Sequence, residues 1–146
     1  MVERIPKYIL LEQKIIGQLI KSGKKIRAEK LLKEVFFFLI QKKVSPAKTL
    51  FVAVFNCMPL LHLRRVRRKR KTFFVPFPLS SSTQIQIAIK SILKVMKNKE
   101  NRRKNKSKVL CEEIIRASNG QSQTIQNVQD SYKQILQNRI YKHYRW

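Results

Sequence analysis

Seven of the eight residues from 64 to 71 are cationic, and five of the seven are arginine. A guanidinium group binds two phosphate oxygens at once and stacks on the faces of bases, which a lysine ammonium does less well. The run therefore predicts binding of a phosphate backbone, although a solvated charged face or a nuclear-localisation signal would look similar. Its cations are Arg64, Arg65, Arg67, Arg68, Lys69, Arg70 and Lys71.

Two further basic segments are candidates for the same chemistry. Lys24 and Lys25 follow Gly23 at a predicted helix junction, where glycine lets the backbone approach a phosphate and the next helix N-terminus favours an anion. A simple helix end with a solvated turn is the alternative there. The second segment, residues 94–108, scatters its Lys and Arg among Asn and Ser, so a solvated loop fits it as well as a binding surface does.

Aromatic and cationic residues alternate over the last six positions. Rings that stack on bases or riboses, next to cations that meet phosphate, suit RNA. We therefore expect Arg145 to contact RNA, with Tyr144 and Trp146 as candidates for stacking. The alternative is that Tyr144 and Trp146 cover the core of the fold. The six residues are Tyr141, Lys142, His143, Tyr144, Arg145 and Trp146.

The chain as a whole is strongly cationic. Its 146 residues include 33 Lys and Arg against 8 Asp and Glu, which gives a formal net charge of +25. Such a charge repels itself in a compact state unless a polyanion neutralises it, so nucleic acid or an anionic membrane surface is the expected partner. At 43% hydrophobic, the chain is too apolar for a disordered basic tail, and its length supports one ordinary core.

Residues that could support catalysis form no recognisable arrangement. His62 and His143 lie far apart, without a Ser, Cys or Asp pattern between them. Glu112 and Glu113 are adjacent, but neighbouring helix positions diverge by about 100°, so their carboxylates do not converge. Glycine-rich phosphate loops and the ligand spacing of a metal site are also missing from the sequence. We expect a protein that is not an enzyme and that uses no cofactor or metal.

Hydrophobic periodicity predicts six helices. Ser22-Gly23 and Asn119-Gly120 end two of them, and Ser45-Pro46 begins another with an N-cap followed by proline. The sixth helix is expected to start near Ser122 and to continue toward His143. The apolar stripes cover residues 11–20, 28–39, 47–58, 85–96, 109–118 and 125–140.

Between the third and fourth helices the pattern changes to β-structure. Residues 61–78 are rich in Val and Phe, while Pro76 and Pro78 exclude a helix interior, so we expect an exposed hairpin with a basic turn near residues 68–70. Strand alternation sends one of Phe73 and Phe74 toward the core, and the other is available to stack on bases.

The predicted fold is mainly α: a six-helix bundle with one projecting basic β-hairpin between helices three and four. Residues 1–146 are expected to form a single domain, with the hairpin over about residues 61–78 and a basic connector over about residues 97–108. Cys57 and Cys111 lie in apolar helical stripes and are expected to be buried free thiols. The richest apolar stretch, residues 50–63, is too short to cross a membrane.

In the order of its short motifs, the chain resembles the small-ribosomal-subunit protein seven family in its bacterial and organellar form. Two motifs carry this resemblance: the tetrapeptide at residues 143–146 and the junction Ser22-Gly23-Lys24-Lys25 followed by Ala28-Glu29. The resemblance spans about residues 11–146. Other positions in register are Ala53, Asn56, Pro59, Thr72, Val75, Pro76, Ala88, Lys90, Leu110, Glu113, Ala117, Asp130 and Asn138.

The chain also departs from the family pattern. Lys69-Arg70 stands where the family usually has Gly-Gly at the hairpin turn, and Thr83-Gln84 replaces an arginine pair before the fourth helix. The basic N-terminal arm of the family is much reduced. The basic end of the family's fourth helix is retained as Lys97 and Lys99, which adds these two lysines to the expected rRNA contacts.

The resemblance implies six helices and a hairpin that bind the rRNA of the head (3′ major) domain of the small subunit. It also implies an early role in head assembly, protein neighbours in the head and platform, and a position beside exit-site tRNA and the mRNA exit path. Two other classes stay open: a non-ribosomal basic RNA-binding assembly factor, and a peripheral protein on an anionic membrane. A peripheral membrane protein would be expected to have long helices with exposed Phe or Trp opposite a basic face.

The composition points to a mitochondrial ribosome. Lys, Ile and Asn together make 44 residues against 8 for Ala and Gly, as expected from AT-rich coding. Residues 1–6 show neither the pattern of a signal peptide nor that of a transit peptide, from which we expect synthesis inside the organelle.

Overall fold

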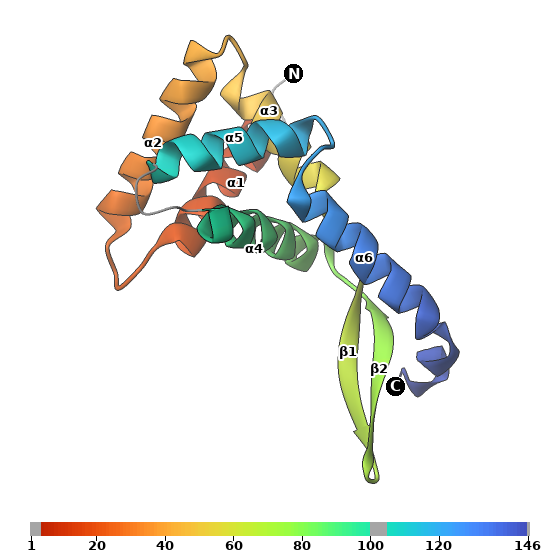
Figure 1. The fold of residues 1–146 in the computed structure, drawn as a ribbon. Helices are drawn as coiled ribbons and strands as arrows, with labels where there is room; N and C mark the ends of the chain where they lie inside the picture. Colours follow the sequence, from red (N-terminus) through yellow and green to blue (C-terminus); the bar gives the residue numbers. More distant parts are fainter. Residues whose placement is uncertain (1–3, 100–104, 146) are drawn as a thin grey trace.

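The computed structural model describes residues 4–99 and 105–145, and the side chains of residues 11–98 and 105–145. This part of the chain forms six α-helices, one two-stranded antiparallel sheet and a 3₁₀ helix, so the predicted fold class is confirmed (Figure 1). The elements are α1 (Arg4–Leu19), α2 (Lys25–Gln41), α3 (Pro46–Asn56), β1 (Leu61–Arg68), β2 (Lys71–Pro78), α4 (Ser81–Lys99), α5 (Lys106–Ser118), α6 (Gln123–Gln137) and η1 (Arg139–Tyr144).

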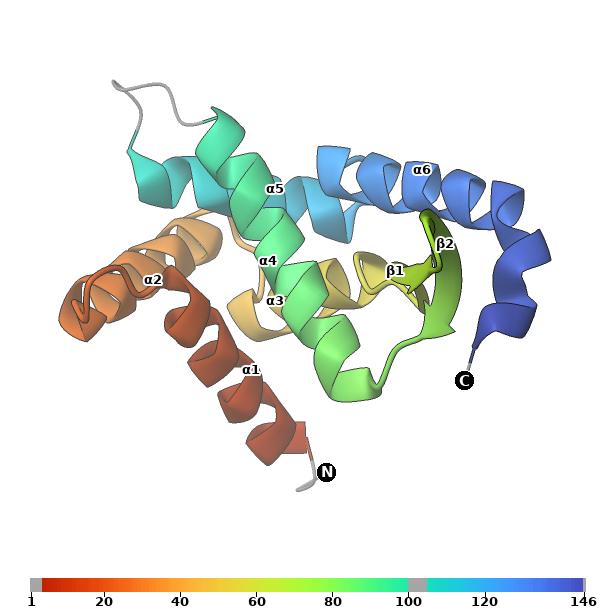
Figure 2. The ribbon, with the colours of Figure 1, turned by 90° about the horizontal axis from the view of Figure 1, so that it is seen from below.

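Helix α5 is the centre of the helical body. It packs against α2, α3 and α4, and its residues Leu110 and Ile114 are buried in the common core. From α3, Leu50 and Val54 belong to the same core, and Ile89 contributes from α4. Figure 2 shows α1 and α4 together on one side of the body, with α3 and α5 behind them. The body is thus a layered bundle around one apolar core, the arrangement that the six amphipathic stripes predict.

The ends of the helices follow the predicted capping residues. Pro46 is the first residue of α3, and the preceding Ser45 accepts a hydrogen bond through its carbonyl oxygen from Thr49 Oγ1 (2.7 Å) rather than through its side chain. Gly120 ends α5 with a φ of 81°, a left-handed conformation that glycine adopts without strain. Ser122 caps α6 by accepting a hydrogen bond from the Thr124 backbone N–H (2.9 Å).

The prediction for the C-terminal end of the sixth helix is wrong in part. The apolar stripe predicts a helix that continues toward His143, but α6 ends at Gln137 and Arg139–Tyr144 form a tighter 3₁₀ helix. Asn138 lies between them, and its side-chain amide donates to the Gln134 carbonyl (2.8 Å). The same carbonyl also accepts from the Asn138 backbone N–H (3.1 Å), so both donors of Asn138 meet the last turn of α6 where the helix ends.

The basic segment over residues 97–108 is mostly helical at its two ends. Residues 97–99 complete α4, and residues 106–108 form the first turn of α5. Between them, residues 100–104 lie outside the described residues. Lys97 and Lys108, at the two limits of the predicted connector, therefore stand on the ends of helices.

The hairpin projects away from the helical body as a two-stranded ribbon (Figure 1). Its register pairs Leu61 with Pro78 at the base and Arg68 with Lys71 at the free end, which leaves Lys69 and Arg70 as the turn. At the base, the Leu79 N–H donates to the Leu60 carbonyl (3.1 Å), and the Leu60 N–H donates to the Tyr132 hydroxyl of α6 (2.8 Å). Because its base is bonded to α6, the ribbon has a fixed direction relative to the body.

Both cysteines are buried, as predicted. Burial, together with the nearby carboxylate of Glu113, raises the pKa of the Cys57 thiol to about 12. A thiol with this pKa stays protonated at neutral pH, so Cys57 is a packing residue and not a nucleophile.

Candidate nucleic-acid interface

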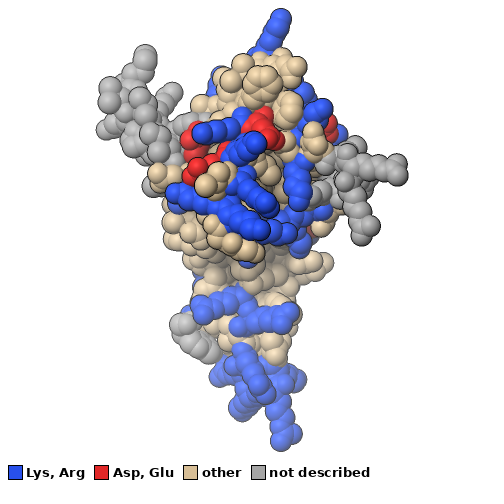
Figure 3. Space-filling model, turned by 90° about the vertical axis from the view of Figure 1, so that its left-hand side faces the viewer, with Lys and Arg blue, Asp and Glu red and all other residues tan. Residues whose placement is uncertain are grey.

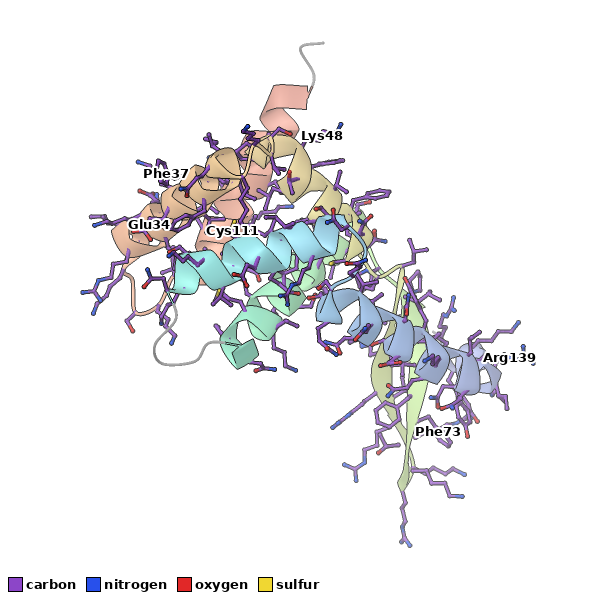
Figure 4. All side chains as sticks on the ribbon, turned by 45° about the horizontal axis from the view of Figure 1, so that its top comes forward. Glu34, Phe37, Lys48, Phe73, Cys111 and Arg139 are labelled. Atoms are coloured by element: carbon purple, nitrogen blue, oxygen red, sulfur yellow. The ribbon has the colours of Figure 1, made fainter. Side chains whose placement is uncertain are left out.

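The two faces of the hairpin carry different sets of side chains. Because partners in the register lie on the same face, Arg65 and Arg67 share one face with Phe74. The opposite face carries Arg64, Arg68 and Lys71 together with Phe73. Phe73 is labelled on the hairpin in Figure 4. The arginine run is therefore split between both faces of the ribbon, so cations surround its free end instead of forming a single row.

Phe73 and Phe74 have the opposite environments that strand alternation predicts. Phe73 is half-buried and packs against Tyr141 and Tyr144 of η1, with ring centroids 5.1 and 5.2 Å apart. Phe74 is 42% exposed, and the Arg65 guanidinium carbon lies 5.6 Å from the centre of its ring. Phe74 is thus the more exposed of these two rings.

The turn of the hairpin has a strained backbone. Lys69 has a φ of 52°, in the left-handed region that favours glycine. Lys69 stands where the family that the chain resembles usually has glycine. Its side chain places a cation at the free end of the ribbon. Figure 3 shows Lys and Arg side chains gathered over this free end and over much of the helical body on the same side.

The C-terminal segment folds back onto the hairpin. Tyr144 is half-buried, with its ring against Phe73 and the Arg68 guanidinium carbon 5.2 Å from the ring centre. Arg145 donates from Nε to the carbonyl oxygen of Pro76 in β2 (2.8 Å). These contacts place Tyr144 against the hairpin and not against the apolar core of the body, and the Arg145 hydrogen bond links the C-terminal segment to β2. Trp146, the other candidate for stacking on RNA, lies outside the described residues.

A groove between α1 and α4 continues the cationic surface along the body. Its volume is about 550 Å³, and its lining includes Gln18 of α1 and three lysines of α4, namely Lys90, Lys94 and Lys97. The lysines are spaced by four and three residues, so they form one row on the helix. Lys97 was among the predicted contacts and Lys94 begins the basic segment of residues 94–108, whereas Lys90 was not predicted as a contact. Its helical spacing from Lys94 and Lys97 is the signal that could have identified it. The side chain of Lys99 lies outside the described residues.

The turn between α1 and α2 carries the remaining predicted contacts. Ser22 and Gly23 have φ values of 51° and 73°, and Lys24 and Lys25 follow at the start of α2. Lys25 lies 3.7 Å from Glu29, one turn further along α2. Both groups are exposed, so this ion pair is weak and Lys25 can exchange it for a phosphate.

The two histidines lie in different places. His62 stands exposed on β1, while the His143 ring packs 4.1 Å from that of Tyr144, so the two imidazoles belong to different surroundings. Within residues 4–99 and 105–145, no group of three or more His, Cys, Asp and Glu residues is placed to hold a metal ion. In the same part of the chain, no helix is long and apolar enough to cross a membrane.

Comparison with known proteins identifies the family. A family model described as ribosomal protein S7p/S5e matches residues 4–139 of this chain. The chain belongs to the ribosomal protein S7p/S5e family. It is a structural, non-enzymatic ribosomal protein of the small-subunit S7 type, and the resemblance found from its short motifs is confirmed.

Individual relatives come from mitochondria and from bacteria. Small ribosomal subunit protein uS7m of Drosophila melanogaster is 34% identical over 102 residues, which are 70% of this chain and 46% of that protein. The uS7 protein of Caldicellulosiruptor saccharolyticus is 28% identical over 134 residues, 91% of this chain and 85% of the relative. The uS7 protein of Thermotoga maritima is 30% identical over 138 residues, 94% of this chain and 88% of the relative. The chain thus spans about half of the mitochondrial relative and most of the bacterial ones.

Proposed function

We propose that this S7-family protein binds the rRNA of the head domain in the small subunit of a mitochondrial ribosome. In this proposal the free end of the hairpin, the lysine row of α4 and the turn before α2 bind phosphates of one folded RNA. The observation that carries the proposal is the hairpin itself, because arginines stand on both of its faces and cations form its turn. A ribbon of this kind suits insertion between RNA segments, where it meets phosphates on either side.

The same proposal includes the neighbours of the protein. From the resemblance to the S7 family we infer binding to the head domain of the rRNA, a role early in head assembly, and proximity to exit-site tRNA and mRNA. Protein neighbours in the head and platform belong to the same inference. The separation between a core-forming body and a projecting ribbon supports it, since the body can rest on one RNA segment while the ribbon reaches another.

Two observations support the mitochondrial location. The Drosophila relative is the mitochondrial form, uS7m. The composition, with 44 Lys, Ile and Asn residues against 8 Ala and Gly, is that of AT-rich coding. We further propose that the gene lies in the organelle, which sequencing of the organellar genome of the source organism would test.

A sucrose gradient in high salt tests the ribosomal assignment. Mitochondrial lysate that contains the epitope-tagged chain is sedimented, and the fractions are probed for the tag and for small-subunit rRNA. The chain should remain with the small subunit, because many phosphate contacts buried in a folded RNA exchange slowly. Release to the top of the gradient would instead indicate a transient assembly factor, and sedimentation with membranes would indicate a membrane-associated protein.

A further inference from the structure

A hollow lies between the free end of the hairpin and the C-terminal segment. Its volume is about 460 Å³, within the range of sites that take small ligands. One part of its lining is cationic and the other is aromatic. The lining residues are Arg68, Lys69, Arg70, Lys71, Phe73 and Tyr144.

The aromatic wall consists of two rings that support each other. Phe73 and Tyr144 have centroids 5.2 Å apart with planes inclined by 32°, and Tyr141 packs against both of them. The Arg68 guanidinium lies over the Tyr144 ring, which adds another flat group to the wall. The Arg145 hydrogen bond to Pro76 holds the C-terminal segment on β2. The wall is therefore formed before any ligand arrives.

This lining matches one kind of ligand. A phosphate alone would need the cations but not the rings, and an apolar ligand would need the rings but not the cations. A paired nucleotide presents its phosphate while its base stays stacked inside the duplex. An unpaired nucleotide presents both, since its base is free to lie against an aromatic face while its phosphate meets the cations.

We propose that this hollow holds one unpaired nucleotide of an RNA, with its base against Tyr144 and Phe73 and its phosphate against the cations of the turn. The inference rests on the proposed function and adds to it the class of RNA that this end of the hairpin takes. The site takes the nucleotide by two kinds of contact, which are stacking of its base on the rings and binding of its phosphate by the cations.

Binding of two synthetic RNAs tests the proposal on the full chain. One is an oligouridylate, and the other is an oligomer of the same length whose riboses carry no bases. The Tyr144→Leu variant should bind the oligouridylate roughly 5- to 150-fold more weakly than the wild type, the effect of one lost stack. Its affinity for the abasic oligomer should be unchanged. Tyr144→Phe, which keeps the ring, is the matched control and should behave as the wild type does.

The outcomes separate this proposal from the proposed function. If the wild type binds both oligomers equally and with strong salt dependence, phosphate binding stands and the nucleotide site is wrong. If it binds neither oligomer, nor a folded head-domain rRNA fragment, the proposed function fails as well.

Photocrosslinking of the unmodified protein avoids any loss of folding in the variants. Small subunits that contain 4-thiouridine and are free of mRNA and tRNA are irradiated, and the crosslinked peptides are mapped. A crosslink to the peptides of Phe73 or Tyr144 supports the site and identifies rRNA as the source. A crosslink that forms only after thiolated mRNA or tRNA is added supports the site with that RNA as the source. No crosslink to either peptide under both conditions overturns the proposal.

Discussion

Lys69 combines an unfavourable backbone with a favourable charge. A non-glycine residue in the left-handed region costs about 1–2 kcal/mol, and Lys69 adopts this conformation with a φ of 52°. Its neighbour Arg70 is the other residue of the turn and does not have a positive φ. The turn therefore offers a pair of adjacent cations of which only one is strained.

Replacing each of the two residues by glycine separates strain from charge. Lys69→Gly should stabilise the hairpin by about 1 kcal/mol, because glycine adopts the left-handed conformation freely. Arg70→Gly should destabilise it by about 0.5–1 kcal/mol, because glycine adds flexibility there without relieving strain. Hydrogen exchange of the amides in β1 and β2 measures both effects. Equal destabilisation by the two changes would show that Lys69 is not strained.

At the scale of single residues, the sequence predicts which residues are functional candidates better than it predicts their backbone conformations and distant contacts. The arginine run identifies the hairpin as the main cationic element, and strand alternation correctly separates Phe73 from Phe74. The left-handed Lys69 could not be predicted, because the pattern of residue types favours glycine at such a position. The hydrogen bond from Arg145 to the Pro76 carbonyl oxygen could not be predicted either, because it joins residues 69 positions apart.

The junction of α5 and α6 depends on a buried carboxylate. Glu113 is 1% exposed and accepts hydrogen bonds from the hydroxyls of Ser122 and Thr124, the second at 3.3 Å. Ser122 is at the same time the N-cap of α6. Glu113 therefore links the middle of α5 to the start of the helix that holds the base of the hairpin.

Removing this carboxylate should weaken the fold. Glu113→Ala leaves two buried hydroxyls without their acceptor and should lower the free energy of unfolding by about 1–3 kcal/mol. Glu112→Ala, at the exposed neighbouring position, should change it by less than about 0.5 kcal/mol. Urea denaturation of both variants gives the comparison. Similar values for the two would mean that the hydroxyls find other partners and that Glu113 does not hold the junction.

At the scale of elements, local sequence signals predict most helix boundaries, but they do not predict the tertiary contacts between elements. The capping residues Ser45, Pro46, Gly120 and Ser122 stand where the helices begin or end. In the sequence, Glu113 is one of two diverging carboxylates and a position in register with the family, but its hydrogen bonds to Ser122 and Thr124 are tertiary contacts that the local pattern does not show. The spacing of the α4 lysines predicts one row on that helix, but it does not predict the groove, because the groove also needs α1 beside the row.

The molecule as a whole is a basic ribbon fixed to a helical body. The body supplies the apolar core through α5, and α6 with η1 supports the hairpin along one side (Figure 1). A net charge of +25 opposes this compact arrangement until an RNA neutralises it. Binding and stability are therefore linked, and the folded protein should be more resistant to unfolding when RNA is bound.

The salt dependence of binding to a head-domain rRNA fragment tests the role of the hairpin most directly. The hairpin variant carries Gln at Arg65, Arg67, Arg70 and Lys71, and the control variant carries Gln at the exposed lysines Lys30, Lys33, Lys43 and Lys48 of the α2–α3 region. The slope of log affinity against log salt should fall by about 3 for the hairpin variant, since each lost phosphate contact contributes roughly 0.7–0.9. The control should keep nearly the slope of the wild type. Equal slopes for the hairpin variant and the wild type would contradict the account.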